Sequence, residues 1–212
     1  MTPERKARIE QVAARRQTDL TVFMERVHKA HNVAAILRTC DAVGVMEAHA
    51  VPPEGGIRPL NHTAQGAQRW VKLQRHHDAR DGLRQLKASG HQIYAAHFSD
   101  AAVDFREPDY TRPTVIVMGT EKFGVSEEAL AECHGEIIIP MIGMAQSLNV
   151  SVATALILYE AQRQRQLAGL YEPKSLEEQP FKSLVQQWIE RELVRRSKGR
   201  GMRSQAADSN DE

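Results

Sequence analysis

The sequence predicts an α/β protein whose parallel sheet is covered by helices on both faces. Apolar runs of strand length occupy residues 20–24, 47–51, 93–96, 114–118 and 136–139. Segments with helical spacing of apolar residues lie between or after these runs, at residues 33–43, 79–89, 126–133 and 150–166. Strands that alternate with helices are typical of parallel sheets, and continuous apolar strands are typical of sheets buried on both faces.

Helical extensions flank this region at both ends. Residues 1–17 predict a short basic helix, and after Gly169 a linker with Pro173 and Pro180 precedes an amphipathic helix. That helix carries an apolar stripe, which indicates packing rather than a ligand site: Phe181, Leu184, Val185, Trp188 and Ile189. We therefore expect a basic N-terminal helical extension at 1–19, a main domain at 20–168, a linker and C-terminal helix at 169–196, and a disordered tail at 197–212.

Composition excludes several classes of protein. Of 212 residues, 42% are hydrophobic and 26% are charged, which is ordinary for one globular domain with appendages. No apolar run reaches the length of a membrane span, and the N-terminus is basic rather than signal-like, so we expect a cytoplasmic protein without a membrane partner. Cys40 and Cys133 lie far apart without a CxxC pairing, so neither a disulfide framework nor a structural metal site is indicated.

The charged residues are distributed unevenly although the net charge is only +1. Residues 1–30 carry seven Lys or Arg against four acids, and residues 188–203 carry six against two. A phosphate backbone responds to local charge rather than to net charge, so both ends are candidate contacts for RNA. A solvated charge run without function is the competing interpretation of either cluster alone.

Ligands of open α/β sheets gather in the loops that follow the carboxyl ends of strands, and three such loops are unusual here. The first leads into residues 31–44, where Asn32 can cap a helix and Arg38 sits among apolar residues. An arginine buried among such residues needs a partner, because an unpaired buried charge is costly. On spacing alone, pairing with a structural carboxylate such as Asp41 is the favoured interpretation.

The second loop lies within residues 117–126, where a strand runs into a segment bounded by Gly119 and Gly124. Glycines let backbone N–H groups approach a ligand closely, although the pattern is neither GxGxxG nor a P-loop. Ser126 is expected to cap the helix that follows.

The third loop lies within residues 137–153 and places Ser147, Asn149 and Ser151 around a helix start. One such side chain would satisfy a helix N-cap, so the excess suggests a ligand. Structural capping remains an equal competitor on this pattern alone.

Taken together, the three loops resemble the three motifs of the TrmH branch of the SPOUT methyltransferases, in the same order and with comparable separations. The resemblance covers roughly residues 7–170, including residues 104–107 (DFRE) and 158–165 (LYEAQRQR). It implies an α/β domain whose C-terminal part is threaded through a loop as a deep trefoil knot. It also implies a homodimer whose active sites are built from both subunits. Neither property follows from composition or periodicity, and knots are rare among folds.

The same resemblance implies RNA 2′-O-methylation with S-adenosylmethionine as the cofactor. The family positions that hold the cofactor correspond to Ala96, Gly119, Ile139, Met144, Ser147 and Leu148. The family's catalytic positions correspond to Asn32, Arg38, Glu121, Ser147 and Asn149. We interpret Arg38 as an anchor for the phosphate beside the reacting 2′-OH rather than as the base, because a guanidinium group keeps its proton up to a pKa above about 12.

Within this branch, a short basic N-terminal helix and a C-terminal helix with a basic end resemble the tRNA guanosine-18 enzymes. That resemblance implies tRNA as the partner, contacted at its phosphates by Arg8, Arg16, Lys29, His31, Arg163 and Arg165. Two alternatives remain open. The same chemistry could act on ribosomal RNA or on another tRNA position, or the chain could be a non-catalytic RNA-binding protein on a decayed scaffold.

Overall fold

The computed structural model describes residues 1–53 and 69–208, with side chains of the last helix described up to residue 194. The chain divides into two compact units, one of residues 17–171 and one of residues 1–16 together with 172–212. Within the described residues, no helix combines the length and the apolar character that crossing a membrane requires.

The larger unit is built on one seven-stranded sheet with the strand order β3-β2-β1-β6-β4-β7-β5. The strands are β1 (Leu20–Glu25), β2 (Glu47–Val51), β3 (Lys72–Arg75), β4 (Gln92–Ala96), β5 (Val103–Asp104), β6 (Thr114–Met118) and β7 (Gly135–Ile138). Every neighbouring pair is parallel. The α/β class and the parallel sheet are therefore confirmed.

Five of the strands match the apolar runs of the sequence to within one residue at either end, whereas β3 and β5 were not predicted. β3 is an edge strand in which only Leu73 is apolar, and β5 has two residues. An edge strand needs no apolar run, because one side of its backbone and much of its surface stay in water. Periodicity therefore carries little signal for strands of this kind.

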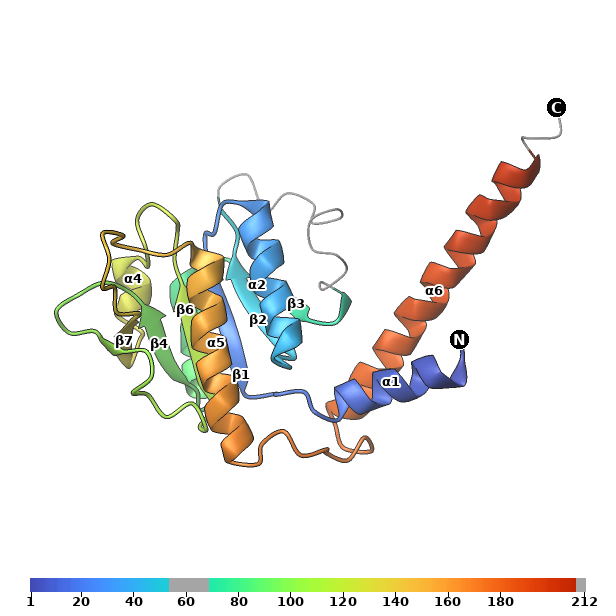
Figure 1. Ribbon diagram of the computed structural model, residues 1–212, viewed down its shortest axis with the longest axis horizontal. Helices are drawn as coiled ribbons and strands as arrows, with labels where there is room; N and C mark the ends of the chain where they lie inside the picture. The colour runs from blue at the N-terminus through green and yellow to red at the C-terminus, as the bar shows by residue number, and fades with distance from the viewer. Residues whose placement is uncertain (54–68, 209–212) are drawn as a thin grey trace. The chain divides into compact units, whose positions relative to one another are not determined.

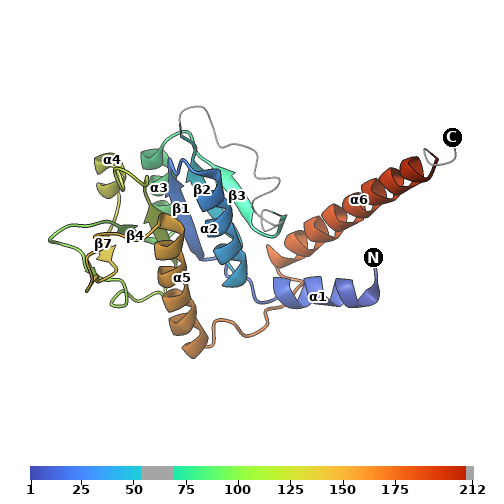
Figure 2. The same cartoon turned by 45° about the horizontal axis from the view of Figure 1, so that its top comes forward.

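Helices cover both faces of the sheet. On one face α2 (Ala30–Ala42) and α5 (Val150–Leu167) lie side by side, as Figure 1 shows. On the other face lie α3 (Ala79–Ala88) and the short α4 (Glu127–Leu130), which are seen in Figure 2. Side chains of β1 alternate between the two cores, with Val22 and Met24 in the first and Phe23 in the second.

Helix ends follow local rules in most places. Ser126 caps α4 as predicted, since its Oγ accepts the N–H of Ala129 at 3.3 Å, although α4 ends three residues earlier than expected. Gly169 ends α5 with φ +74°, a conformation that favours glycine, and the N–H of Leu170 donates to the carbonyl of Arg165 at 2.9 Å.

The smaller unit pairs two terminal helices, α1 (Pro3–Ala13) and α6 (Phe181–Asp208). The apolar stripe of α6 is used for packing, with Phe181, Leu184 and Trp188 buried together with Ile9 of α1. The backbone of α6 continues to Asp208, whereas we expected disorder from residue 197. Residues 209–212 of that expected tail lie outside the described residues.

Candidate active site

The three unusual loops meet at the carboxyl edge of the sheet. They follow β1, β6 and β7, and the pairings β1–β6, β6–β4 and β4–β7 are all parallel. Parallel strands point their carboxyl ends toward the same edge, so segments about a hundred residues apart in sequence become neighbours.

A chain of hydrogen bonds joins one side chain from each loop. Asn32 donates through Nδ2 to Glu121 Oε1 at 2.7 Å, and Asn149 donates through Nδ2 to Asn32 Oδ1 at 3.2 Å. Glu121 also accepts the backbone N–H groups of His28 and Lys29, each at 3.3 Å. Asn32 is only 1% exposed and stands between the other two side chains, so this network braces the three loops against one another.

Glu121 is held as a carboxylate. Burial by itself raises the pKa of Glu121, but hydrogen bonds from Asn32 and from the backbone N–H groups of His28 and Lys29 together outweigh it and leave the pKa below its ordinary value of 4.5. A carboxylate that accepts several hydrogen bonds in the ionised form is a poor proton acceptor at neutral pH. Its arrangement suits positioning of the loops rather than proton transfer.

Asn149 combines two uses that the sequence left as alternatives. Its Oδ1 caps α5 by accepting the N–H of Ser151 at 2.8 Å and the Ser151 hydroxyl at 2.7 Å. Its Nδ2 is the group that donates to Asn32. The start of α5 is thereby tied to the start of α2 through one amide side chain.

Gly119 is required by a close backbone approach. A Cβ at this position would lie 2.0 Å from the carbonyl oxygen of Gly124 and 2.3 Å from the nitrogen of Val125. The loop closes on itself there, with the N–H of Thr120 donating to the carbonyl of Gly124 at 2.8 Å and the reverse bond at 3.0 Å. Any side chain at Gly119 would open this loop.

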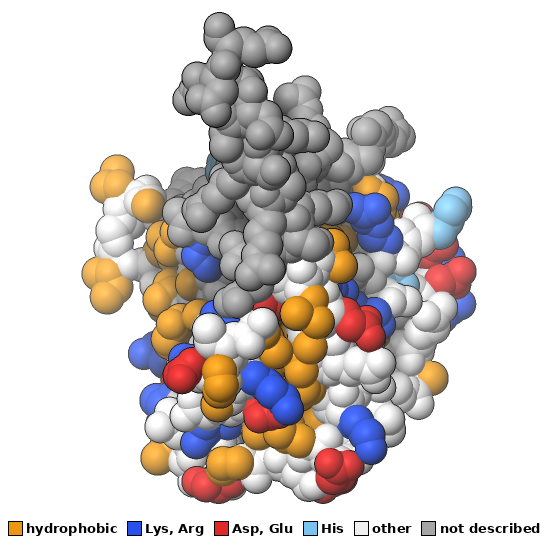
Figure 3. All heavy atoms as spheres, turned by 90° about the vertical axis from the view of Figure 1, so that its right-hand side faces the viewer, with side chains coloured by type: hydrophobic (Ala, Val, Ile, Leu, Met, Phe, Trp, Pro, Cys, Tyr) orange, Lys and Arg blue, Asp and Glu red, His pale blue; other side chains and the backbone are white. Residues whose placement is uncertain are grey.

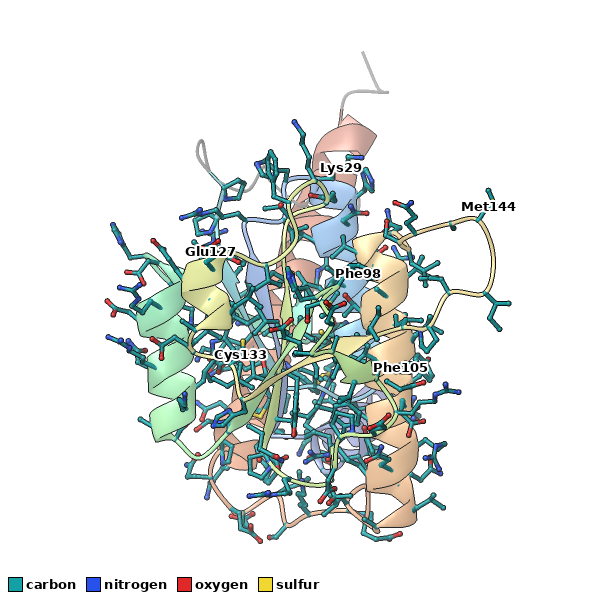
Figure 4. All side chains as sticks on the ribbon, turned by 90° about the vertical axis from the view of Figure 1, so that its left-hand side faces the viewer. Lys29, Phe98, Phe105, Glu127, Cys133 and Met144 are labelled. Carbon is teal, nitrogen blue, oxygen red and sulfur yellow. The ribbon has the colours of Figure 1, made fainter. Side chains whose placement is uncertain are left out.

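A cavity of about 550 Å³ lies beside the network, and we call it the first cavity. Its apolar wall includes Met118, Ile137 and Ile157. It is lined by five of the six positions that the resemblance assigned to the cofactor: Ala96, Gly119, Ile139, Ser147 and Leu148. The sixth, Met144, is outside this lining and fully exposed, on the projecting part of the loop before α5 (Figure 4).

Comparison with known proteins agrees with this geometry. Residues 19–159 match the SpoU rRNA Methylase family, which is most of the larger unit and includes all three loops. The chain belongs to the SpoU methylase family.

Relatives of this SpoU methylase include two proteins named tRNA (guanosine(18)-2′-O)-methyltransferase. The one from Escherichia coli is 61% identical over 171 residues, covering 81% of this chain and 75% of the relative. The one from Thermus thermophilus is 55% identical over 188 residues, covering 89% of this chain and 97% of the relative. Among solved structures, the A. aeolicus TrmH/SpoU tRNA modifying enzyme is 44% identical with a TM-score of 0.84, covering 89% of this chain and 96% of that one.

Two interpretations of the first loop were wrong for this SpoU methylase. Asn32 does not cap α2, which begins at Ala30 with Lys29 at the N-cap position; its side chain is used for Glu121 instead. Arg38 is exposed rather than buried, because α2 turns this position away from its apolar core side. Burial is therefore no reason for Arg38 to have a carboxylate partner, and its pairing with Asp41 stays a prediction. Arg38 does not line the first cavity.

Arg165 has a structural role instead of the predicted RNA contact. Its side chain is 1% exposed, Nε donates to Gln17 Oε1 at 2.9 Å, and Nη1 donates to the carbonyl of Tyr110 at 3.0 Å. Nη2 pairs with the carboxylate of Asp19. A guanidinium group satisfied on all sides inside the protein is not available to a phosphate.

Arg16 is likewise buried, and its guanidinium carbon lies 5.0 Å from the ring centre of Trp188 within the smaller unit. The predicted phosphate contact of Arg16 is therefore wrong. The other four predicted RNA contacts are exposed: Arg8, Lys29, His31 and Arg163. On the face displayed in Figure 3, acidic and basic side chains are interspersed. Exposure of a basic residue on such a face does not by itself indicate an RNA contact.

Sequence reasoning passed over two exposed phenylalanines of the first cavity. Phe98 follows β4 and is 81% exposed, and Phe123 lies in the loop after β6 and is 76% exposed. Figure 4 shows Phe98 below Lys29 at this side of the sheet. The available signal was a large apolar ring within a polar loop that follows a strand. Among the described residues, no group of three or more His, Cys, Asp or Glu could hold a metal ion.

Proposed function

We propose that this chain transfers a methyl group from S-adenosylmethionine to the ribose 2′-OH of guanosine-18 in the D-loop of tRNA. The observation that carries the proposal is the network of Asn32, Glu121 and Asn149 beside a cavity at the carboxyl edge of the sheet. Identities of 55% and 61% to proteins named for this reaction support the same substrate.

The first cavity fits the cofactor in size and chemistry. Its volume of about 550 Å³ lies within the ordinary range for small-molecule sites. Apolar side chains suit an adenine ring, and the closely packed loop at Gly119 brings backbone groups to the cavity edge. Ala96, Gly119, Ile139, Ser147 and Leu148 would hold the cofactor here, and Met144 would join them only if its loop moved toward the cavity.

The residues of this chain have to align the ribose and assist loss of its proton. When bound, S-adenosylmethionine would supply an electrophilic methyl group for transfer to the ribose oxygen. Arg38 anchors the phosphate next to the 2′-OH through two parallel N–H bonds, and the hydroxyl proton leaves to that phosphate or to solvent. Ser147 and Asn149 orient the ribose, while Asn32 and Glu121 hold the loops that carry them.

A second copy of the chain would complete each site. α5 exposes an apolar stripe at i, i+4 and i+7, formed by Val152, Leu156 and Tyr159, and the loop before it exposes Ile142 and Met144. A homodimer would cover this stripe. It would also allow an exposed Arg38 of one copy to act at the first cavity of the other, which fits the position of Arg38 outside the lining of its own cavity.

Further parts of the proposal concern the chain path and the RNA contacts. We propose that the segment from β7 to α5 is threaded through a loop as a deep trefoil knot. The insertion of β7 between β4 and β5 and the packing of α5 against α2 support this path. Arg8, Lys29, His31 and Arg163 would contact tRNA phosphates in the cytoplasm. The proposed domain limits are 1–19 for the N-terminal extension, 20–168 for the main domain, and a linker with a C-terminal helix from residue 169.

Ribosomal RNA is the competing substrate, because the matching family is described by rRNA methylation. Methyl transfer from labelled S-adenosylmethionine to unmodified tRNA transcripts tests the choice. We expect transfer with wild type, a rate roughly 100- to 1,000-fold lower with Arg38→Ala, and no transfer with 2′-deoxyguanosine at position 18. Unchanged transfer to the deoxy transcript would move the target elsewhere. No transfer to tRNA despite cofactor binding would favour ribosomal RNA.

A further inference from the structure

A second cavity of about 500 Å³ lies next to the first. It opens at the carboxyl ends of β1 and β2, and its lining includes Arg26 and Pro53. Thr120, Phe123 and Gly124 line both cavities, so the loop after β6 is their common wall. A nucleotide whose ribose reached this wall from one side would meet the cofactor cavity on the other.

Phe123 offers a stacking surface on that wall. Its ring is 76% exposed on a loop, where it gains little from packing within the chain. Unstacked RNA bases are commonly held on aromatic side chains, and stacking of this kind tolerates any base. The ammonium group of Lys122 lies 4.9 Å from the ring centre of Phe123, so a positive charge that can attract a phosphate backbone stands beside the ring.

Arg26 offers donors of the kind that distinguish guanine. It has φ +50°, an unusual conformation for a residue other than glycine, and its N–H is held by the carbonyl of Val51 at 2.9 Å. Its side chain is exposed and, among the side chains described within residues 1–53 and 69–194, forms no hydrogen bond or ion pair. Guanine presents the acceptors O6 and N7 side by side, and arginine is the side chain that most often binds this pair.

Glu25, the residue before Arg26, has a structural use in this cavity and is not available to bind a base. Glu25 is 2% exposed and accepts both the N–H of Ser126 at 2.9 Å and the Ser126 hydroxyl at 2.6 Å. It fixes the start of α4 against the end of β1. The cavity therefore has one side held by hydrogen bonds between Glu25 and Ser126, and its exposed side chains include Arg26 and Phe123.

We propose that the second cavity receives the base of the target guanosine, with the base stacked on Phe123 and its O6 and N7 bound by Arg26. The inference rests on the proposed function, because it takes the methylated ribose to lie at the common wall. Phe123 would add affinity for any base, whereas Arg26 would add preference for guanine. The competing use of Arg26 is a phosphate contact, which carries no preference among bases.

A double-mutant cycle separates the two uses of Arg26. The full-length protein and its Arg26→Ala variant are compared on tRNA transcripts that carry guanosine or 7-deazaguanosine at position 18, the latter lacking the N7 acceptor. We expect each single change to weaken binding by about tenfold and the double change to add little to either. Losses that multiply would show that Arg26 acts elsewhere and would overturn its assignment.

The cycle is read twice, as the Kd of the transcript without methyl donor and as kcat/KM with it. The Kd cycle reports on Arg26 even if no methyl is transferred, so failure of the proposed function and failure of this inference are distinguishable. Arg112→Ala is the matched control, because Arg112 is an exposed arginine just before β6, at the opposite edge of the sheet. We expect no coupling between Arg112 and N7.

Phe123 is tested by ring replacement. We expect Phe123→Trp to bind tRNA as wild type does, and Phe123→Leu and Phe123→Ala to lose roughly 10- to 100-fold in affinity for guanosine and 7-deazaguanosine transcripts alike. Full affinity in Phe123→Leu would mean that apolar bulk, not a stacked ring, is what matters, and would overturn the stacking assignment. Cofactor Kd measured on the same variants identifies any loss that arises in the first cavity.

Discussion

The two ends of α5 carry polar side chains that have opposite uses. At the start of the helix, Asn149 is exposed, caps the helix and reaches Asn32 at the edge of an open cavity. Near its end, Arg165 is buried, and its donors are taken by Gln17, Asp19 and backbone carbonyls. From the sequence, Asn149 was predicted to be catalytic and Arg165 was predicted to contact RNA.

The two regions differ in how much open space surrounds the polar atoms. They also differ in how many hydrogen bonds those atoms already make within the chain. A saturated buried group stabilises the fold, and removing it leaves partners without hydrogen bonds. A group beside an open cavity keeps capacity for a ligand. Substitutions at the cavity end should therefore change the reaction rate more than stability, and substitutions at the buried end should do the reverse.

The largest expected effect is on catalysis, at Arg38. Arg38→Ala should lower kcat by roughly 100- to 1,000-fold, because a preorganised charge contact to the reacting nucleotide is lost. Arg38→Lys should be almost as impaired, since an ammonium group cannot make the two parallel bonds of a guanidinium group. Single-turnover methyl transfer measures both, and thermal unfolding should change little because the side chain is exposed. Substantial activity in the lysine variant would contradict the anchor role.

Arg165→Ala should show the opposite profile. We expect the free energy of unfolding to fall by about 3–5 kcal/mol, because Asp19 is left with an unpaired charge and two carbonyls lose a donor. Urea denaturation measures this loss. Activity per folded molecule, assayed well below the melting temperature, should stay close to that of wild type. A large drop in tRNA affinity without a loss of stability would restore the RNA-contact interpretation.

A third polar cluster lies on the other face of the sheet, where His49 and His76 are joined at 2.9 Å and both rings lie against Phe23. Burial, followed by the charge of His76, lowers the pKa of His49 from 6.5 to about 4. Because the folded protein keeps His49 neutral while the unfolded chain binds a proton, stability should fall as pH drops from about 6.5 toward 4, by up to about 1.4 kcal/mol per pH unit. Urea denaturation of wild type and His49→Gln between pH 6.5 and 4 measures how the free energy of unfolding changes with pH. Equal slopes of this free energy against pH in the two proteins would argue against a neutral buried His49.

Asn32 belongs to both classes, since it is buried and lies in the active-site network. Asn32→Ala should cost about 1–3 kcal/mol of stability, because Glu121 and Asn149 each lose a partner. It should also lower kcat by roughly 10-fold or more through loosened loops. Parallel measurements of unfolding and methyl transfer test this double effect, and a change in only one of the two would show that bracing and catalysis are separate.

The smallest expected effect is at Arg163, two residues from Arg165 on the same helix. Its exposed side chain pairs with Glu160 at 2.8 Å, a contact of little worth to stability. Arg163→Ala should weaken tRNA binding a few-fold and reduce the salt dependence of log K by about 1, with unfolding unchanged. Filter binding over a range of salt concentrations measures the slope. An unchanged slope would remove Arg163 from the set of RNA contacts.

The strand positions, the parallel sheet and the helix cap at Ser126 could be predicted from the sequence, because they depend on apolar periodicity and on residues a few positions apart. The loops that carry the candidate site could also be predicted, because parallel strands send their carboxyl ends to one edge. The edge strands β3 and β5 could not, since neither has an apolar run.

Only the tertiary structure decided which polar side chains face a ligand. Arg165 meets Gln17 and Asp19, which lie almost 150 positions away, and Arg38 is exposed to solvent although its neighbours in sequence are apolar. Local spacing predicts which face of a helix is apolar. It does not say what packs against that face, or how many hydrogen-bond partners a polar side chain finds there. Those depend on contacts between distant segments, which form only when the chain has folded.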